Sequence, residues 1–173
     1  KFFKKLLSIE NKNSLKIDQF LRFVSLIPNA KKNHLSELKM FNFSKKDKKK
    51  LLLLTNQELK IHNKLEKNDI KRILYSIDKQ SLVGLAILSW ALSANKIMDK
   101  EWISILDQIN KLKVPIFPLK AKDLLNFGLK EGPIIGEIFS EIEQDWIDSN
   151  FELNKEDLLL KSKALIVSKG HNF

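Results

Sequence analysis

Apolar side chains recur three and four residues apart along most of the chain, which is the spacing of one face of an α-helix. The clearest stripe predicts a helix over residues 99–112 and consists of Trp102, Ile105, Leu106 and Ile109. The preceding segment, 81–94, is apolar on nearly every face, which is typical of the buried central helix of a bundle. No segment sustains the alternation of a β-strand. The pattern predicts an all-α protein built as a multi-helix bundle.

Capping residues predict where several helices begin. Ser44 followed by Asp47 fits a capping box, and Asn68 and Asn154 are expected to cap two later helices. Shorter apolar faces predict three earlier helices, at residues 2–7, 17–27 and 34–40. Arg22 falls on the polar side of the second of these, and we expect its side chain to lie in solvent.

Two prolines, Pro115 and Pro118, interrupt the helical pattern. Proline disfavours helix both at its own position and at the residue before it, so an extended segment is expected here. We place a domain boundary at this segment. The prediction is a helical body subdomain over residues 1–112 and a smaller helical tail subdomain over 113–173.

Within the tail, residues 120–147 predict a helix-turn-helix hairpin. The first helix is expected to end at Gly128, because glycine takes the left-handed conformation of a helix C-terminus without a steric penalty. Pro133, directly after Gly132, suits the first position of the second helix. Gly136 lies one turn further on, and we expect it to let a neighbour approach closely.

Charge adds a candidate partner to this picture. The chain has a net charge of +10, and 29 of its 31 basic residues are lysine, which favours a polyanionic partner. A cluster of lysines over 45–50 falls in the first turns of a predicted helix, where cations oppose the helix dipole and an anionic ligand would relieve the conflict. A solvated lysine run beside the core explains the same residues without a ligand.

The tail hairpin offers a second candidate for anion binding. The start of its second helix leaves backbone N–H groups unpaired, and the lysines at 120, 122 and 130 lie close to it in sequence. Such a turn is suited to holding a phosphate. An ordinary helical hairpin, whose glycines only cap and pack, is the alternative.

Several kinds of chemistry find no support in the sequence. The absence of cysteine excludes disulfides and thiolate metal sites and favours a reducing cytoplasm. Glu141 and Glu143 diverge by about 200° on a helix and cannot share a metal, and no serine lies in a nucleophile elbow. We therefore assign no catalytic and no metal-binding residue. The longest apolar run, 81–92, is too short to cross a bilayer, so no membrane partner is expected.

Particular stretches of sequence identify a family. They are PIFPLKAKDLL, GLKEGPIIGEIFSEIE and QDWIDSNFELNKEDLL, preceded by LRFVSLIPN and LKMFNFSKKDKKKLLLL. Together they resemble the C-terminal body and tail region of bacterial tRNA nucleotidyltransferases of the class II CCA-adding enzyme and poly(A) polymerase family. They follow the family's order and cover nearly all of the chain. The family's catalytic half does not appear in it.

The resemblance implies a helical body and tail that grip the acceptor and TΨC arms of tRNA. The expected RNA-binding residues are Lys45, Lys46, Lys49, Lys120, Lys122, Lys130, Gly132 and Gly136. The chain itself is expected to bind no cofactor and to be inactive alone, because Mg²⁺ and ATP or CTP belong with a catalytic head, which would be a separately encoded partner. Both CCA addition and poly(A) addition fit the resemblance. Two alternatives stay open: a structural or protein-interaction bundle, and an inactive fragment of a split reading frame.

Overall fold

A computed structural model describes residues 1–27, 42–55, 61–127 and 132–169, and in these ranges the secondary structure is helical, with no strand. The all-α prediction is confirmed. The chain divides into two compact units, Lys1–Lys113 and Val114–Phe173, and each is described here by itself. The sequence places a boundary after residue 112. The helix expected at 34–40 lies outside the described residues.

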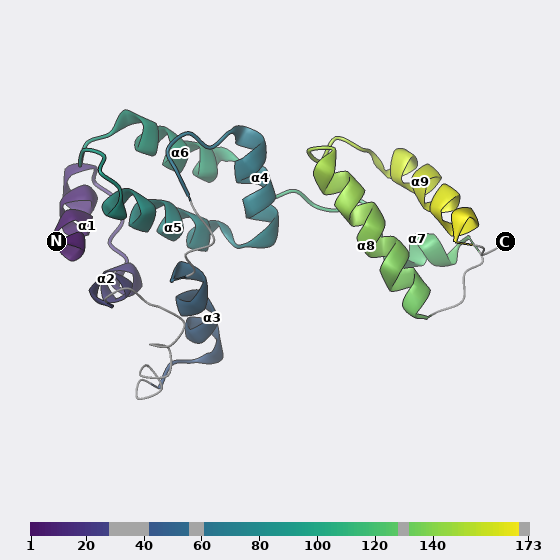
Figure 1. Ribbon diagram of the computed structural model, residues 1–173, viewed down its shortest axis with the longest axis horizontal. Helices are drawn as coiled ribbons and strands as arrows, with labels where there is room; N and C mark the ends of the chain where they lie inside the picture. Colours follow the sequence, from purple (N-terminus) through teal and green to yellow (C-terminus); the bar gives the residue numbers. More distant parts are fainter. Residues whose placement is uncertain (28–41, 56–60, 128–131, 170–173) are drawn as a thin grey trace. The chain divides into compact units, whose positions relative to one another are not determined.

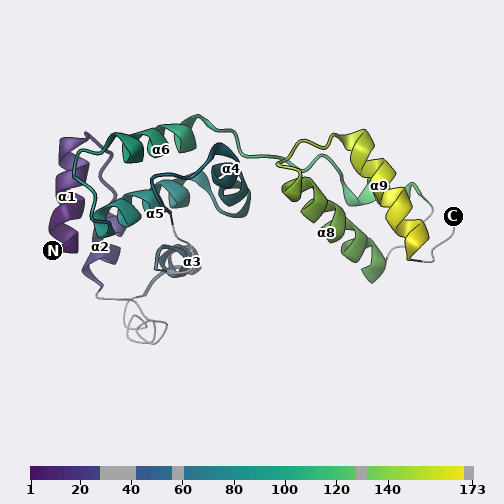
Figure 2. The same cartoon turned by 45° about the horizontal axis from the view of Figure 1, so that its top comes forward.

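The first unit is a bundle around one central helix (Figure 1). Its helices are α1 (Phe2–Lys12), α2 (Gln19–Leu26), α3 (Lys45–Leu54), α4 (Lys67–Ser76), α5 (Lys79–Leu92) and α6 (Lys100–Lys111). Helix α5 contacts each of the other five, and it runs beside α6 in both views (Figures 1 and 2). Because neighbours cover it on several sides, α5 can be apolar on nearly all faces, as the sequence predicts.

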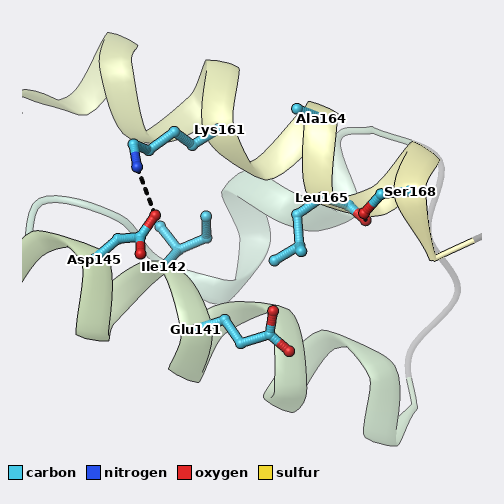
Figure 3. A pocket seen from close by; sticks show the side chains of 7 residues that line it. All are labelled: Glu141, Ile142, Asp145, Lys161, Ala164, Leu165 and Ser168. Atoms are coloured by element: carbon cyan, nitrogen blue, oxygen red, sulfur yellow. Dashed lines mark hydrogen bonds and ion pairs between the residues drawn. The ribbon is translucent and has the colours of Figure 1, made fainter.

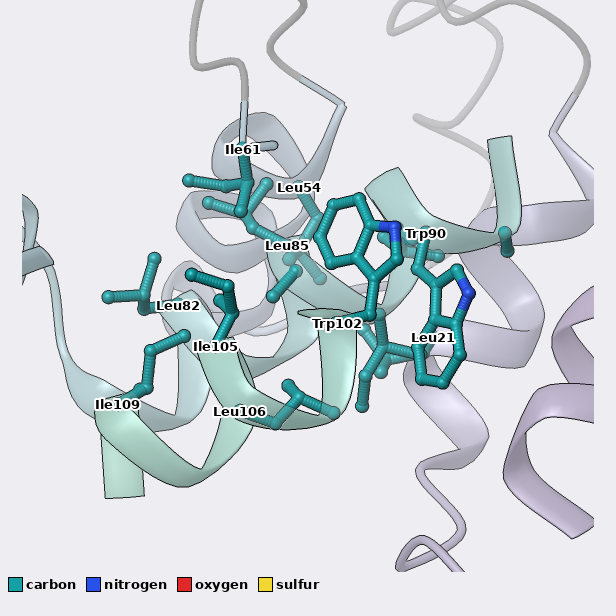
Figure 4. Close-up of a cluster of buried hydrophobic side chains, with 14 of the residues drawn as sticks. Leu21, Leu54, Ile61, Leu82, Leu85, Trp90, Trp102, Ile105, Leu106 and Ile109 are labelled. Carbon is teal, nitrogen blue, oxygen red and sulfur yellow. The ribbon is translucent and has the colours of Figure 1, made fainter. Parts of the chain in front are cut away.

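The predicted stripe of α6 packs into this core (Figure 4). All four of its members are buried. Trp102 stacks on Trp90 of α5 with ring centroids 6.2 Å apart and an interplanar angle of 8°. The indole Nε1 of Trp90 donates to the carbonyl of Lys96 at 2.8 Å, so this buried polar atom is satisfied.

Most of the predicted caps are confirmed, and one is wrong. The Ser44 Oγ accepts from the backbone N–H of Asp47 at 3.1 Å at the start of α3. Asn154 and Asp157 form a capping box at the start of the last helix. Helix α4, by contrast, begins at Lys67, so its N-cap residue is Glu66 and not the predicted Asn68, and no side-chain capping bond forms there.

The second unit is a small bundle of α7 (Ala121–Leu125), α8 (Pro133–Asp148) and α9 (Lys155–Ser168). Pro133 begins α8, as predicted. Helix α7 is shorter than the predicted 120–127, because the chain leaves the helix at Asn126. The glycine expected to end it lies outside the described residues.

Aromatic packing fixes this second bundle. The Trp146 ring of α8 contacts Phe117 of the extended proline segment at 5.2 Å and Phe151 at 4.8 Å between centroids. Residues 113–120 form no helix, as the two prolines predict. Asn150 and Phe151 both have positive φ, 59° and 67°, which closes the turn between α8 and α9.

Candidate nucleic-acid interface

The lysine cluster predicted from the sequence lies on the first turns of α3. Lys45, Lys46, Lys48 and Lys49 are all exposed. Within the described part of the chain, none of these four side chains has an ion pair or hydrogen bond to a protein group. A helix rises about 1.5 Å per residue, so Lys45 and Lys49 stand about 6 Å apart along its axis on one face. The row therefore presents several free ammonium groups along a single helix.

The fifth lysine of the cluster has a different role. Lys50 forms an ion pair with Asp18 at 3.2 Å, and its Nζ lies 5.0 Å from the centroid of the Phe20 ring. Both partners belong to the start of α2. Together with the buried Leu51 and Leu54, this contact attaches α3 to the bundle. Lys50 holds the helix in place while the other four lysines point outward.

Gly84 of α5 also helps to position α3. A Cβ atom at this residue would lie 2.9 Å from Leu21 Cδ2 and 3.4 Å from Leu54 Cδ2. Glycine thus allows α2 and α3 to pack closely on the same side of α5. No local sequence pattern distinguishes this glycine, because its role depends on two helices that are distant in sequence.

The positive charge of the chain is divided unequally between the two units. Residues 1–113 contain 24 Lys and Arg against 11 Asp and Glu, a net charge of +13. Residues 114–173 contain seven basic and ten acidic residues, a net charge of −3. A polyanion is therefore attracted to the first unit and weakly repelled by the second. A count of charges by segment would have found this difference from the sequence alone.

The lysines expected on the tail hairpin lie in this acidic unit. Lys120 and Lys122 are exposed, and Lys130 lies outside the described residues. The Asp123 carboxylate follows Lys122 in sequence. It accepts hydrogen bonds from the Lys155 side chain at 2.8 Å and from the backbone N–H of Lys120 at 2.7 Å. The hydrogen bond from Lys155 has the largest effect on Asp123 and lowers its pKa. The backbone hydrogen bond from Lys120 and the charges of Lys155 and Lys122 lower it further. The carboxylate therefore offsets part of the local positive charge.

The two glycines of the hairpin are both exposed. Gly132 is the N-cap residue of α8 and has extended backbone, with φ of 167°. Among the described residues, and apart from its chain neighbours and the backbone of its own helix, no atom lies within 4 Å of a Cβ built at Gly136. The prediction that Gly136 admits a close neighbour is therefore wrong for contacts within the described chain.

The expectation that the Arg22 side chain lies in solvent is wrong, because this side chain, 33% exposed, forms an ion pair within the first unit. Its Nε group donates to the Glu10 carboxylate at 2.9 Å, and its guanidinium forms an ion pair with the same carboxylate at 2.8 Å. The Glu10 side chain is only 2% exposed. Arg22 therefore neutralises a buried charge on α1, which makes it a structural residue of the first unit.

No cluster of three or more His, Cys, Asp or Glu side chains suited to a metal ion occurs among the described residues. In the same ranges, no helix has the length and apolar character needed to cross a membrane. The lysines of α3 remain the most distinctive chemical feature of the described surface.

Comparisons with known proteins agree in part with the resemblance found in the sequence. No family model matches the chain. It is similar to the CCA tRNA nucleotidyltransferase 1, mitochondrial, of Danio rerio, with 33% identity over 55 residues. The match covers 32% of this chain and 13% of that protein, so it spans only a small part of the relative. A region of this chain is thus related in sequence to a tRNA nucleotidyltransferase.

Proposed function

We propose that this chain is an RNA-binding C-terminal portion of a tRNA nucleotidyltransferase of the bacterial class II type, acting in the cytoplasm. The lysine row of α3, Lys45, Lys46, Lys48 and Lys49, would contact the sugar–phosphate backbone of tRNA. Catalysis, with Mg²⁺ and ATP or CTP, would belong to a separately encoded head. The sequence similarity to a tRNA nucleotidyltransferase supports the substrate class.

One observation carries this proposal: four exposed lysines without protein partners in the described chain stand on one short helix, within a unit of net charge +13. Lysine is a point charge with three rotatable donors, which suits contact with phosphates rather than bidentate reading of bases. Structured RNA is recognised mainly through its phosphates and 2′-hydroxyls, because its deep major groove excludes side chains. The α3 row has the chemistry for such backbone contacts.

The test compares two triple variants with the same loss of charge in the same unit. Lys45→Gln, Lys46→Gln and Lys49→Gln together remove three of the row's charges. Lys64→Gln, Lys67→Gln and Lys100→Gln remove three exposed charges elsewhere. Binding of fluorescently labelled tRNA is measured by anisotropy over a range of salt concentrations.

If each lysine of the row neutralises one phosphate, the slope of log K against log salt should flatten by about 2 to 3 units in the α3 variant, since about 0.7 to 0.9 ions are released per phosphate. The control variant should change the slope by less than about one unit. Equal changes in both variants would mean that net charge alone attracts the RNA. Absence of tRNA binding by the unmodified chain at low salt would favour the interaction bundle or the inactive fragment instead.

A further inference from the structure

The α8–α9 pair of the second unit has one open side. Helix α7 contacts both α8 and α9 and lies behind them in Figure 3. On the side facing the viewer, the two helices form a groove of about 400 Å³. Its floor is apolar, and the residues that form it are Ile142, Ala164 and Leu165. A further helix laid in this groove would complete a four-helix arrangement.

The outer surface of α9 continues this apolar floor. Leu160 is 72% exposed and Val167 is 54% exposed. With Ala164, also exposed, they stand at i, i+4 and i+7, which is one stripe along a helix. Helix α9 is therefore apolar both toward the core, through Leu158 and Ile166, and away from it. An exposed apolar stripe beside an apolar groove is typical of a surface that a partner covers.

Acidic side chains lie along the α8 side of the groove, and two of them, Glu141 and Asp145, line it. Glu137, Glu141 and Asp145 follow one another at four-residue spacing along α8, and all three are exposed. Lys161 lies 2.6 Å from Asp145, and Lys169 lies 2.5 Å from Glu141 and 3.9 Å from Glu137. Exposed ion pairs of this kind contribute little to stability, so an incoming cation can share or replace them. The unit as a whole has a net charge of −3.

We propose that the α8–α9 groove is a docking site for a lysine-rich amphipathic helix of a partner protein. The apolar face of that helix would cover Ala164 and the stripe beside it, and its lysines would reach the carboxylates of α8. This is the recognition mode in which an amphipathic helix lies in an apolar groove, with complementary charge selecting the partner. The proposed site includes none of the α3 lysines and requires no RNA.

The probe is a labelled 18-residue helical peptide with leucine on one face and lysine on the other, added to the nucleic-acid-free full chain. A scrambled peptide of the same composition has the same charge but no apolar face. We expect the amphipathic peptide to bind at least tenfold more tightly than the scrambled one. Because the first unit is strongly positive, general electrostatic attraction cannot recruit either peptide there.

Ala164→Arg fills the groove with a bulky cation and should reduce binding of the amphipathic peptide at least tenfold. Gln144→Arg adds the same charge to exposed α8 surface outside the groove lining and should change it less than about threefold. Leu160→Ser with Val167→Ser alters only exposed side chains and should also weaken binding, which keeps the test valid if Ala164→Arg fails to fold.

Equal affinity for the two peptides, or binding that neither groove variant weakens, would overturn the proposal. Failure of the amphipathic peptide to bind at all would overturn it too. The groove variants should leave the salt dependence of tRNA binding unchanged, so the outcome is independent of the proposed RNA function.

Discussion

Arg22 of α2 donates a hydrogen bond from Nε to one carboxylate oxygen of Glu10 and forms an ion pair with the same oxygen; Glu10 lies on α1 and is almost fully buried. The other carboxylate oxygen, Oε1, is buried and has no hydrogen-bond partner within the described chain. The Glu10 charge therefore depends on Arg22. The pair ties the first helix of the unit to the second.

Substitutions of Arg22 and of Glu10 should lower the stability of the protein by different amounts. Arg22→Ala leaves a buried carboxylate without its partner and should destabilise the protein by about 3 kcal/mol. Glu10→Gln leaves an arginine that still reaches water, and should cost about 1 kcal/mol. Urea unfolding followed by circular dichroism measures both, with exposed Lys4→Gln on α1 as a control expected within about 0.5 kcal/mol. Similar costs for the two substitutions would mean that the Glu10 charge is not held by Arg22.

The tail lysines should contribute less to RNA binding than the α3 row. Replacing Lys120, Lys122 and Lys130 by Gln removes the same charge as the α3 triple variant, but from a unit that is already acidic. We expect the salt slope for tRNA to flatten by less than about one unit. A loss equal to that of the α3 variant would place the hairpin on the RNA path, as the sequence analysis first proposed.

Gly84 and Gly136 permit a matched comparison of the same substitution in two helices. Alanine is favoured over glycine by about 1 kcal/mol in a helix interior. Gly136→Ala should therefore stabilise the protein by about 0.5 to 1 kcal/mol, since its Cβ meets no atom. Gly84→Ala must displace the Leu21 side chain and should be less favourable by at least about 1 kcal/mol. Thermal unfolding of both variants provides the comparison, and equal shifts in Tm would show that α2 moves aside freely.

Gly136 also allows a clean test of RNA contact in the tail. Because the chain leaves open space around this residue, Gly136→Val should retain the helical content of the protein. If RNA phosphates approach the start of α8, the added side chain should weaken tRNA binding. Unchanged tRNA affinity would remove Gly136 and Gly132 from the candidate interface.

The stability of the second unit should depend on pH through Asp123. Its hydrogen bond with Lys155 lowers its pKa below the ordinary value, so the folded state favours the charged form more than the unfolded state does. This contribution is complete above about pH 4, the ordinary range of aspartate, and is lost as the pH falls through the lowered pKa. Asp123→Asn should reduce protection of the α8 amides against hydrogen exchange at pH 7. The substitution should have little effect at low pH, and an equal effect at both would contradict the role of the charge.

Catalysis by the isolated chain is predicted to be absent. The sequence contains no Gly-Ser turn with paired carboxylates on a strand, which a template-independent nucleotidyltransferase uses to hold its metal ions and triphosphate. With Mg²⁺, ATP and CTP, we expect no labelled nucleotide on a tRNA 3′ end above a control without protein. Incorporation that persists through repeated purification would show that the chain carries its own active site.

Local signals in the sequence predicted much of this fold. The α6 stripe, the start of α8 at Pro133 and the caps of α3 and α9 all depend on residues within a few positions of one another. The predictions that failed concern contacts between distant residues. Arg22 was expected in solvent because its partner, Glu10, lies twelve residues earlier on another helix. The groove of the second unit likewise depends on two helices facing each other, which periodicity along one helix does not reveal.

The central place of α5 has a consequence for how the protein emerges during synthesis. The α3 helix, Lys45–Leu54, leaves the ribosome before α5, Lys79–Leu92, on which its buried leucines pack. A ten-residue helix is marginal in water by itself, and domains fold as units once their chain is complete. While some tens of further residues are being added, the nascent chain therefore exposes the lysines and leucines of the α3 segment, because the helix on which they pack has not yet been made. The helix on which α3 packs is made later, so this lysine-rich segment meets the anionic surface of the ribosome before it joins a folded core.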